Sequence, residues 1–283
     1  MPATSNRTLN LFFPQWQGSA RLELYEGAKL LHKALQNKIS FEQVPISLTY
    51  SLTTEKNIFG YSQILSQLLN ACEVIQLHNP ERVLTIGGDC GVEIAPISFL
   101  NNKYNQSLNI LWLDAHSDLN TPSSSPSAHF HGMPLRVLLG EGDAEILKLA
   151  FSSLRPDQIF LIGAREFDLA EKSLIREKGL SIFPARDINL ESFGDVFSAL
   201  NDTDSNKIYI HLDLDVIDPE GFPHVACPTP GGIYVEKLKS FLNFLRKNFD
   251  VVGFSVLEFL PTGSKKSAIL EIVNIVEGFE LIV

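Results

Sequence analysis

The chain contains 283 residues, with 33 Asp and Glu against 23 Lys and Arg and a formal net charge of −10. Its length suits one large α/β domain or two small ones, and its 45% hydrophobic and 20% charged residues exclude extensive disorder. The shortage of basic residues argues against nucleic acid as a partner, because few cations are left to neutralise phosphates.

Short apolar segments alternate with amphipathic, helix-length segments along the chain. The expected elements, in chain order, are strand Thr8–Phe13, helix Leu22–Leu35, strand Phe41–Ser47, helix Tyr61–Leu77, strands Arg82–Gly87, Leu108–Asp114 and Gln158–Gly163, helix Asp168–Lys178, strands Leu180–Phe183 and Lys207–Asp213, helix Val235–Asn248, strand Val251–Glu258 and a helix from Lys265 onward. Several strands are apolar on both faces, which is typical of parallel strands covered by helices on both sides. The alternation predicts an α/β fold, a three-layer α/β/α sandwich around a mostly parallel sheet, in a single domain over residues 1–283.

Two long irregular segments, Ala115–Met133 and Val216–Ile233, each follow the carboxyl end of an expected strand. Loops of this length in a compact domain are usually functional. Open α/β sheets also bind ligands at the carboxyl ends of their strands. We therefore expect the functional site between these two segments.

The sequence predicts a cytoplasmic protein without contact to a membrane. No window approaches the roughly 18 uninterrupted apolar residues that a membrane-spanning helix needs. The first residues lack the charged and then apolar arrangement of a secretory signal. The three cysteines, Cys72, Cys90 and Cys227, are too few and too scattered for a disulfide framework.

Carboxylates and a histidine gather at two strand ends. Asp114, His116 and Asp118 follow one apolar strand, and Asp213 and Asp215 follow another. Residues two apart in an extended chain point to the same side, so each set can converge. One such array alone is often a capped turn with a solvated histidine, but four carboxylates at one sheet edge repel strongly unless cations neutralise them. Oxygen and imidazole ligands together suit divalent ions, and this mixture suits Mn²⁺.

Five blocks in order resemble the ureohydrolase family, which contains arginases, agmatinases and formiminoglutamases. They are Gly87–Cys90, Asp114–Asp118, His131–Pro134, Asp213–Asp215 and Glu258–Pro261. The resemblance implies a hydrolase of C–N bonds in linear amidines that binds two divalent metal ions, Mn²⁺ by preference, at the carboxyl ends of the strands. It also implies a small guanidino substrate and a homo-oligomer, either a trimer or a hexamer.

The same resemblance assigns ligands by position. Asp114 and Asp213 would bridge the two ions, His116 and Asp215 would complete one, and Asp118 with Cys90 would complete the other. A metal-bound hydroxide would then attack the guanidinium carbon of the substrate.

Among the residues named by the resemblance, three have catalytic roles. They are Asp118, which is also a ligand, His131, which would pass a proton to the departing amine, and Glu258, which would pair with the guanidinium.

The segment before His131 resembles the arginase version of this loop. Asn120, Ser125 and Ser127 match positions that hold a substrate carboxylate, whereas a Ser-rich segment alone is equally typical of a flexible surface loop. Asp168 and Glu171 match positions that bind an α-ammonium group, although acids in a first helical turn also favour the helix N-terminus. Together these positions describe an α-amino acid, and we expect L-arginine to be hydrolysed to L-ornithine and urea.

Cys90 departs from the family pattern, which has a metal-binding histidine at this position. A thiolate ligand is soft and favours Zn²⁺, Fe²⁺ or Co²⁺ over Mn²⁺. Alternatively, Cys90 is a buried thiol and a single ion is bound. Two further hypotheses therefore stay open, a ureohydrolase for another guanidino or formimino substrate and a catalytically weak or silent metal-binding relative.

Overall fold

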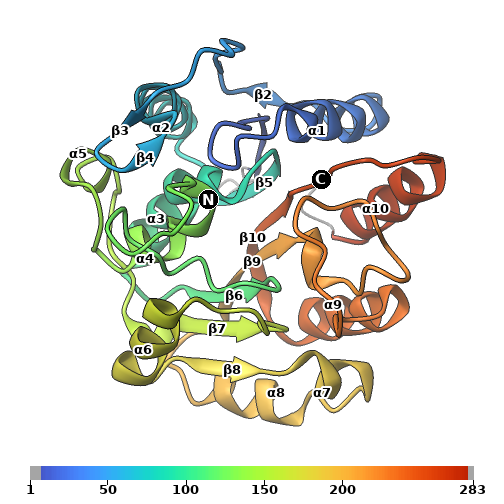
Figure 1. The fold of residues 1–283 in the computed structure, drawn as a ribbon. Helices are drawn as coiled ribbons and strands as arrows, with labels where there is room; N and C mark the ends of the chain where they lie inside the picture. Colours follow the sequence, from blue (N-terminus) through green and yellow to red (C-terminus); the bar gives the residue numbers. More distant parts are fainter. Residues whose placement is uncertain (1–7, 280–283) are drawn as a thin grey trace, which may run out of the picture.

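The centre of the molecule is an eight-stranded sheet in which every neighbouring pair of strands is parallel. The computed structural model describes residues 8–279 (Figure 1). Across the sheet the order is β2 (Glu42–Gln43), β1 (Thr8–Phe13), β5 (Arg82–Gly87), β10 (Asp250–Leu257), β9 (Lys207–Asp213), β6 (Asn109–Leu113), β7 (Ile159–Ile162) and β8 (Ser181–Phe183). A separate antiparallel pair consists of β3 (Thr54–Glu55) and β4 (Ile58–Phe59). The predicted parallel sheet is confirmed.

Helices cover both faces of this sheet (Figure 1). One layer contains α1 (Leu22–Leu35), α7 (Ala185–Asn189), α8 (Gly194–Asn201), α9 (Val235–Asn248) and α10 (Lys266–Gly278). The other contains α2 (Tyr61–His78), α3 (Ile94–Lys103), α4 (Pro134–Leu138), α5 (Ala144–Leu147) and α6 (Leu169–Lys178). Alternate residues of one strand enter the two resulting cores, as Ile208 and Ile210 do on one face of β9 and Tyr209 on the other. The three-layer α/β/α prediction is confirmed.

The structure corrects the predicted strand Phe41–Ser47. Only Glu42–Gln43 pairs with β1, at the edge of the sheet. Pro45 has no N–H to donate, so it cannot extend the ladder, and Ser47 donates its backbone N–H to the side chain of Gln67 instead.

The sequence patterns did not predict the helix α3. Its residues 94–101 are all buried, so this helix carries no polar face and lacks the amphipathic period that identified the others.

The two ends of the described chain lie in or against the central sheet. β1 pairs with β5 inside the sheet, and α10 packs on α1 with Ile272 and Val276 in the core. The predicted single domain covers residues 1–283, of which residues 1–7 and 280–283 lie outside the described residues. No helix within the described part of the chain is long and apolar enough to span a membrane.

Parallel pairing places the carboxyl ends of all eight strands at one edge of the sheet. The two long segments singled out from the sequence leave this edge, after β6 and after β9. They contain short 3₁₀ turns, Phe130–Gly132 and Leu214–Val216, but are otherwise irregular. A bridge between Ile217 and Ile233 closes the base of the second segment. The fold thus brings the chemically distinctive residues of distant blocks to one place.

Candidate active site

Each strand end holds its carboxylate by a local backbone hydrogen bond. Asp114, directly after β6, accepts the N–H of His116 at 2.7 Å, and Asp213, at the end of β9, accepts the N–H of Asp215 at 2.7 Å. Asp215 in turn accepts the N–H of Ala115 at 3.0 Å, which ties the two strand ends together. These bonds orient the carboxylates, and the second oxygen of Asp114 also accepts the indole N–H of Trp112 at 3.1 Å.

One group of possible metal ligands joins Asp114, His116 and Asp215. His116 Nδ1 lies 3.3 Å from Asp114 Oδ1 and 3.1 Å from Asp215 Oδ2, and the three ligand atoms lie within 4.8 Å of one another. A histidine nitrogen and two carboxylate oxygens are suitable ligands for a divalent first-row metal ion. These are three of the four residues that the sequence assigned to one ion.

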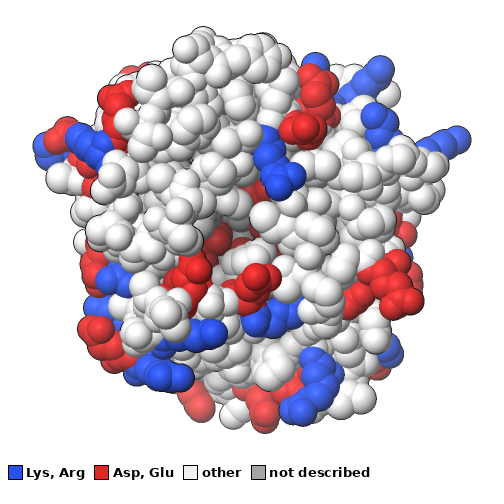
Figure 2. Space-filling view, in the orientation of Figure 1, with Lys and Arg blue, Asp and Glu red and all other residues white. Residues whose placement is uncertain are grey.

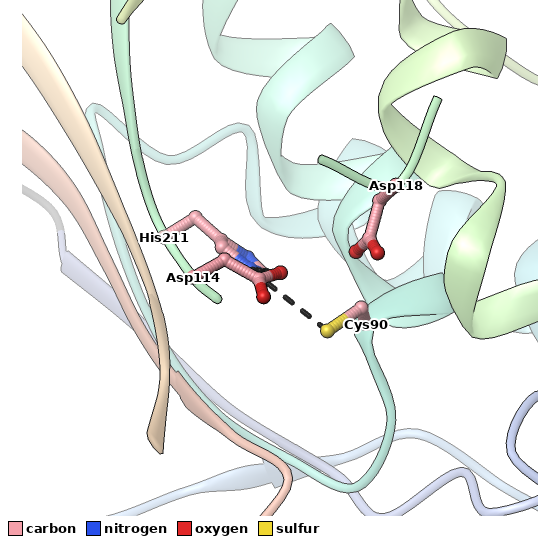
Figure 3. Close-up of side chains that lie close together, drawn as sticks. All are labelled: Cys90, Asp114, Asp118 and His211. Carbon is pink, nitrogen blue, oxygen red and sulfur yellow. Dashed lines mark hydrogen bonds and ion pairs between the residues drawn. The ribbon is translucent and has the colours of Figure 1, made fainter. Parts of the chain in front are cut away.

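A second group joins Cys90, Asp114 and Asp118 with His211, and their ligand atoms also lie within 4.8 Å of one another. Figure 3 shows the four side chains pointing toward one another. Cys90 comes from the 3₁₀ turn after β5, and its Sγ donates to Asp213 Oδ2 at 3.2 Å. The structure therefore brings Cys90 into contact with the predicted ligand cluster.

Sequence reasoning missed His211. The signal was present, because His211 precedes Asp213 by two residues on β9, and the same two-residue period that grouped Asp213 with Asp215 includes it. Its partner Glu93 was missed as well. Glu93 follows Cys90 by three residues in the turn after β5 and carries no pattern that marks it in the sequence.

Burial and mutual repulsion shift the titration of the cluster. Burial and the charge of Asp114 raise the pKa of Asp215 to about 6 and also raise that of Asp118. Burial and the charge of Asp215 raise the pKa of Asp213, and burial with the neighbouring carboxylates raises that of the Cys90 thiol. A divalent cation between these groups would reverse the shifts, since it favours their charged forms.

Two buried carboxylate oxygens fit cationic partners. Asp118 Oδ2 and Glu258 Oε2 have no hydrogen-bond partner among residues 8–279. Leaving an ionised carboxylate oxygen buried and unpaired costs on the order of several kcal/mol. Both residues also have left-handed backbones, with φ of 52° and 60°, a conformation that non-glycine residues adopt mostly where the surroundings impose it. The residues present therefore fit a metal ion at Asp118, and the sulfur of Cys90 is the one unusual donor.

Glu258 lies beside His131 at the mouth of the cluster. Its Oε1 accepts the N–H of Cys90 at 3.2 Å and lies 3.4 Å from His131 Nδ1. Burial opposes the charged form of His131, but the hydrogen bond and charge of Glu258 outweigh it and raise the histidine pKa. Asp89 lies behind this pair, where burial and the charge of Glu258 raise its pKa to about 7. Glu258 thus presents its free oxygen with a protonatable neighbour alongside.

One pocket unites the two predicted regions. The predicted residues in its lining are His116, Asp118, Asn120, Ser125, Ser127, His131, Asp168, Glu171, Asp213, Asp215 and Glu258. Cys90 and Asp114 are fully buried and contact this lining through Asp213 and His116. Figure 2 shows a hollow near the middle of this face with acidic side chains within it and along its rim.

The outer wall of the pocket is held by its own side chains. Asn120 donates to Asp168 Oδ2 at 2.7 Å. Ser125 and Ser127 accept the backbone N–H groups of the turn that follows them, and their hydroxyl oxygens lie 3.5 Å apart, a long contact that a ligand acceptor in the pocket could replace. Glu171 is more fully engaged, since Oε1 accepts from the Ser117 hydroxyl and a backbone N–H, and Oε2 accepts the N–H of Asp168. Glu171 therefore fixes the position of Asp168.

Arg165 is a further residue that sequence reasoning did not identify. Its guanidinium donates to the backbone carbonyls of Asp215 at 2.9 Å and Thr229 at 2.6 Å, and to that of Pro230 at 3.1 Å. It thereby clamps the end of β9 to the segment 216–233. The five donors of a guanidinium suit this task, and lysine could not reproduce the fork.

Known proteins with similar sequences identify the family to which this site belongs. The family model described as the arginase family matches residues 19–277. The chain belongs to the arginase family. An arginase from Staphylococcus aureus is 31% identical to it over 213 residues, which cover 73% of this chain and 70% of the relative. The predicted ureohydrolase resemblance is confirmed, and the chain is a hydrolase of the arginase type.

Solved structures agree with the fold. The crystal structure of Entamoeba histolytica arginase in complex with L-ornithine matches with a TM-score of 0.86 at 24% identity over 98% of both chains. Formimidoylglutamase from Bacillus subtilis matches with a TM-score of 0.68 at 17% identity, over 96% of this chain and 86% of the other. Arginase-family proteins are binuclear metal enzymes, and the clustered carboxylates, histidines and cysteine agree with that property.

Proposed function

We propose that the chain hydrolyses L-arginine to L-ornithine and urea. The observation that carries the proposal is the composition of one pocket, which has a ligand cluster at its base and hydroxyl, amide and carboxylate groups along its wall. The base suits a divalent metal site, and the wall suits the charged head of an α-amino acid. The relatedness to an arginase at 31% identity supports the same substrate.

The ligands proposed for the two ions follow the predicted assignment. Asp114 and Asp213 would be shared by the two ions, His116 and Asp215 would complete the ligands of one, and Asp118 with Cys90 would complete those of the other. Bound divalent ions lower the pKa of water from about 15.7 toward about 7, which provides the nucleophile near neutral pH. We propose Mn²⁺ for the position with only oxygen and nitrogen donors, because sulfur at the other favours a softer ion.

Glu258 orients the guanidinium. Its free Oε2 is buried and has no partner in the described part of the chain, so a cationic guanidinium satisfies it with a charge-assisted hydrogen bond. The other oxygen is fixed by the N–H of Cys90 and by His131. The carboxylate therefore holds the reacting carbon above the ligand cluster.

His131 completes the proposed reaction. A new C–O bond forms at the guanidinium carbon, the C–N bond to the departing amine breaks, and the amine nitrogen needs a proton. His131 lies in the pocket wall beside Glu258, whose charge favours the protonated imidazole. It is the group proposed to give that proton.

The amino acid head is proposed to bind at the outer wall. Ser125 and Ser127 have hydroxyl hydrogens available for the α-carboxylate, with the amide of Asn120 alongside. Asp168 provides a negative charge for the α-ammonium, and Glu171 keeps it in place. Agmatine lacks the carboxylate and would leave the hydroxyl groups unused.

The test is urea release after incubation of purified protein with Mn²⁺, using L-arginine, agmatine and other guanidino compounds in parallel. The proposal predicts metal-dependent urea from L-arginine and at least about 100-fold lower kcat/KM with agmatine, the equivalent of about 2.7 kcal/mol for the lost head contacts. A preference for another guanidino compound would retain the reaction and reject the substrate. No urea with any compound or divalent metal would reject the function in favour of a silent relative.

Assembly and location are further proposals. A trimer or hexamer follows from the family resemblance and is tested by light scattering of the purified protein, where a monomer would contradict it. A cytoplasmic location is tested by fractionation of cells that express the natural chain.

A further inference from the structure

This chain has Cys90 where the family pattern has a histidine, and the imidazole of His211 lies on the other side of the same cluster. His211 is 0% exposed and comes from β9, whereas Cys90 comes from the turn after β5. Nε2 of His211 lies 3.6 Å from Asp114 Oδ2 and 3.9 Å from Cys90 Sγ. Figure 3 shows its ring directed at the space between Cys90, Asp114 and Asp118.

A buried network fixes which nitrogen of His211 faces this space. Nδ1 lies 2.9 Å from Glu93 Oε1, and Glu93 also accepts hydrogen bonds from Tyr209, at 2.6 Å, and from Ser255. A carboxylate can only accept here, so Nδ1 carries the hydrogen, and in the neutral imidazole Nε2 presents its lone pair to the cluster. A carboxylate behind the non-ligating nitrogen is the usual arrangement of a metal-binding histidine.

The sheet holds the ring in place. His211 is paired with Trp112 on β6 and with Ser255 on β10 in the register of the sheet. The Trp112 indole stacks on the imidazole with ring centres 3.5 Å apart and an angle of 10°. Stacking on one side and the Glu93 bond on the other leave the ring little freedom to turn. The nitrogen is thus presented in a fixed direction, as a ligand requires.

A structural role alone does not account for Nε2. A core histidine that only fills space is expected to find an ordinary hydrogen-bond partner for each nitrogen. Among the described residues, Nε2 has one hydrogen-bond partner, the sulfur of Cys90 at 3.9 Å, and its distance of 3.6 Å to Asp114 Oδ2 exceeds the ordinary N–H···O bond of about 2.9–3.0 Å. Asp118 Oδ2, in the same group, has no partner within residues 8–279. A metal ion among these atoms would give both His211 Nε2 and Asp118 Oδ2 a close partner.

We propose that His211 is the imidazole ligand of the metal position at Cys90, Asp114 and Asp118, and that Glu93 positions it. The imidazole that the family has at position 90 is thereby supplied from β9, and the donors are one nitrogen, one sulfur and carboxylate oxygens. The neighbouring position at Asp114, His116 and Asp215 has only nitrogen and oxygen donors. The two positions therefore differ in softness, and the sulfur-containing one prefers Co²⁺ or Zn²⁺ to Mn²⁺. This inference deepens the proposed function and rests on its metal centre.

The test counts bound ions without reference to activity. Purified protein and variants are titrated with Co²⁺, the bound ions are counted by elemental mass spectrometry, and ligand-field absorption reports the coordination of each ion. The unaltered protein should bind two ions per chain. His211→Gln should bind one, and Glu93→Gln should bind the second ion about 10–100-fold more weakly. The matched control is His224→Gln, a buried histidine outside the cluster, which should bind two.

Restoration of an imidazole at position 90 separates a ligand role from a structural one. Adding Cys90→His to the His211→Gln variant should restore the second ion, because position 90 then supplies the imidazole ligand that position 211 no longer has. Circular dichroism checks that each variant is folded. If His211→Gln does not fold, X-ray absorption of the Co²⁺-loaded unaltered protein counts imidazoles directly, with one expected at each ion.

Three results would overturn the inference. They are a His211→Gln variant that retains two ions with unchanged affinity, one imidazole for two ions in the absorption spectrum, or no bound ion in the unaltered protein. Failure of the proposed function looks different. An unaltered protein that binds two ions and loses one with His211→Gln, yet releases no urea, would reject the reaction and support the ligand.

Discussion

A glycine in α1 lets the first helix touch the backbone that follows β10, next to Glu258. A Cβ added at Gly27 would lie 1.8 Å from the carbonyl oxygen of Phe259 and 3.1 Å from Pro261 Cδ. Phe259 directly follows Glu258, so this contact ties α1 to the segment that carries Glu258. Because the obstacle is a backbone oxygen rather than the end of a flexible side chain, Gly27→Ala must move the helix or the strand end.

The expected cost follows from two opposed effects. In a helix interior, alanine is more favourable than glycine by about 1 kcal/mol. Overpacking a tight contact costs about 1–3 kcal/mol, and a backbone obstacle places this contact at the upper end of that range. The net prediction is a loss of about 2 kcal/mol in the free energy of unfolding, opposite in sign to the usual effect of this substitution.

Urea denaturation measures this loss. The control is Gly194→Ala at the start of α8, where no atom of the described chain lies within 4 Å of the added Cβ and stability should stay equal or rise slightly. If Gly27→Ala were as stable as the unaltered protein, the close approach of α1 to the strand end would be refuted.

Three further predictions concern charge, metal and substrate. Burial opposes ionisation of Asp250, but its bonds to Lys207 and Arg82 prevail and lower its pKa in the folded protein. The ionised carboxylate therefore stabilises the fold fully above the unfolded pKa of about 3.9. This stabilisation is lost as the pH falls through the lower folded pKa. Asp250→Asn should therefore cost about 1–2 kcal/mol by urea denaturation at pH 7 and clearly less at pH 3, and equal losses would contradict this. Chelation should lower the melting temperature in calorimetry, since ions at 100 times their Kd add about 2.7 kcal/mol, and an unchanged temperature would argue against a metal centre. Asp168→Ala should raise KM for L-arginine at least about 10-fold with a smaller effect on kcat, and steady-state kinetics with an unchanged KM would exclude its contact with the substrate.

Periodicity and strand position predicted the fold well. β1, β5, β9, α1 and α9 match their predicted bounds, because each is a short, largely apolar run or an amphipathic stretch of helical period with distinct ends. The predicted elements differ from the structure at β2 and at α3, where the sequence pattern does not match the element that forms. Pro45 interrupts the predicted strand Phe41–Ser47, and α3 is buried all round and so has no polar face to reveal a helix.

The candidate site was predictable where residues share a short motif. Asp114 and Asp213 were found because each begins an array with a spacing of two. Glu93 and Arg165 act on residues far away in the sequence, and no local pattern indicates those contacts. His211 lies between these cases, since its spacing indicated the correct face of β9 but only the tertiary structure brings it to Cys90.

The proposed function depends on a two-ion metal centre at the carboxyl ends of β6 and β9. Crystals grown with Mn²⁺ and measured at the manganese absorption edge test it most directly, because the anomalous map locates each ion without assumptions about activity. We expect two peaks, one among Asp114, His116 and Asp215 and the other beside Cys90 and Asp118. The second peak should be stronger in crystals grown with Co²⁺ and measured at the cobalt edge. An anomalous map without a peak at these strand ends would contradict the proposed metal centre.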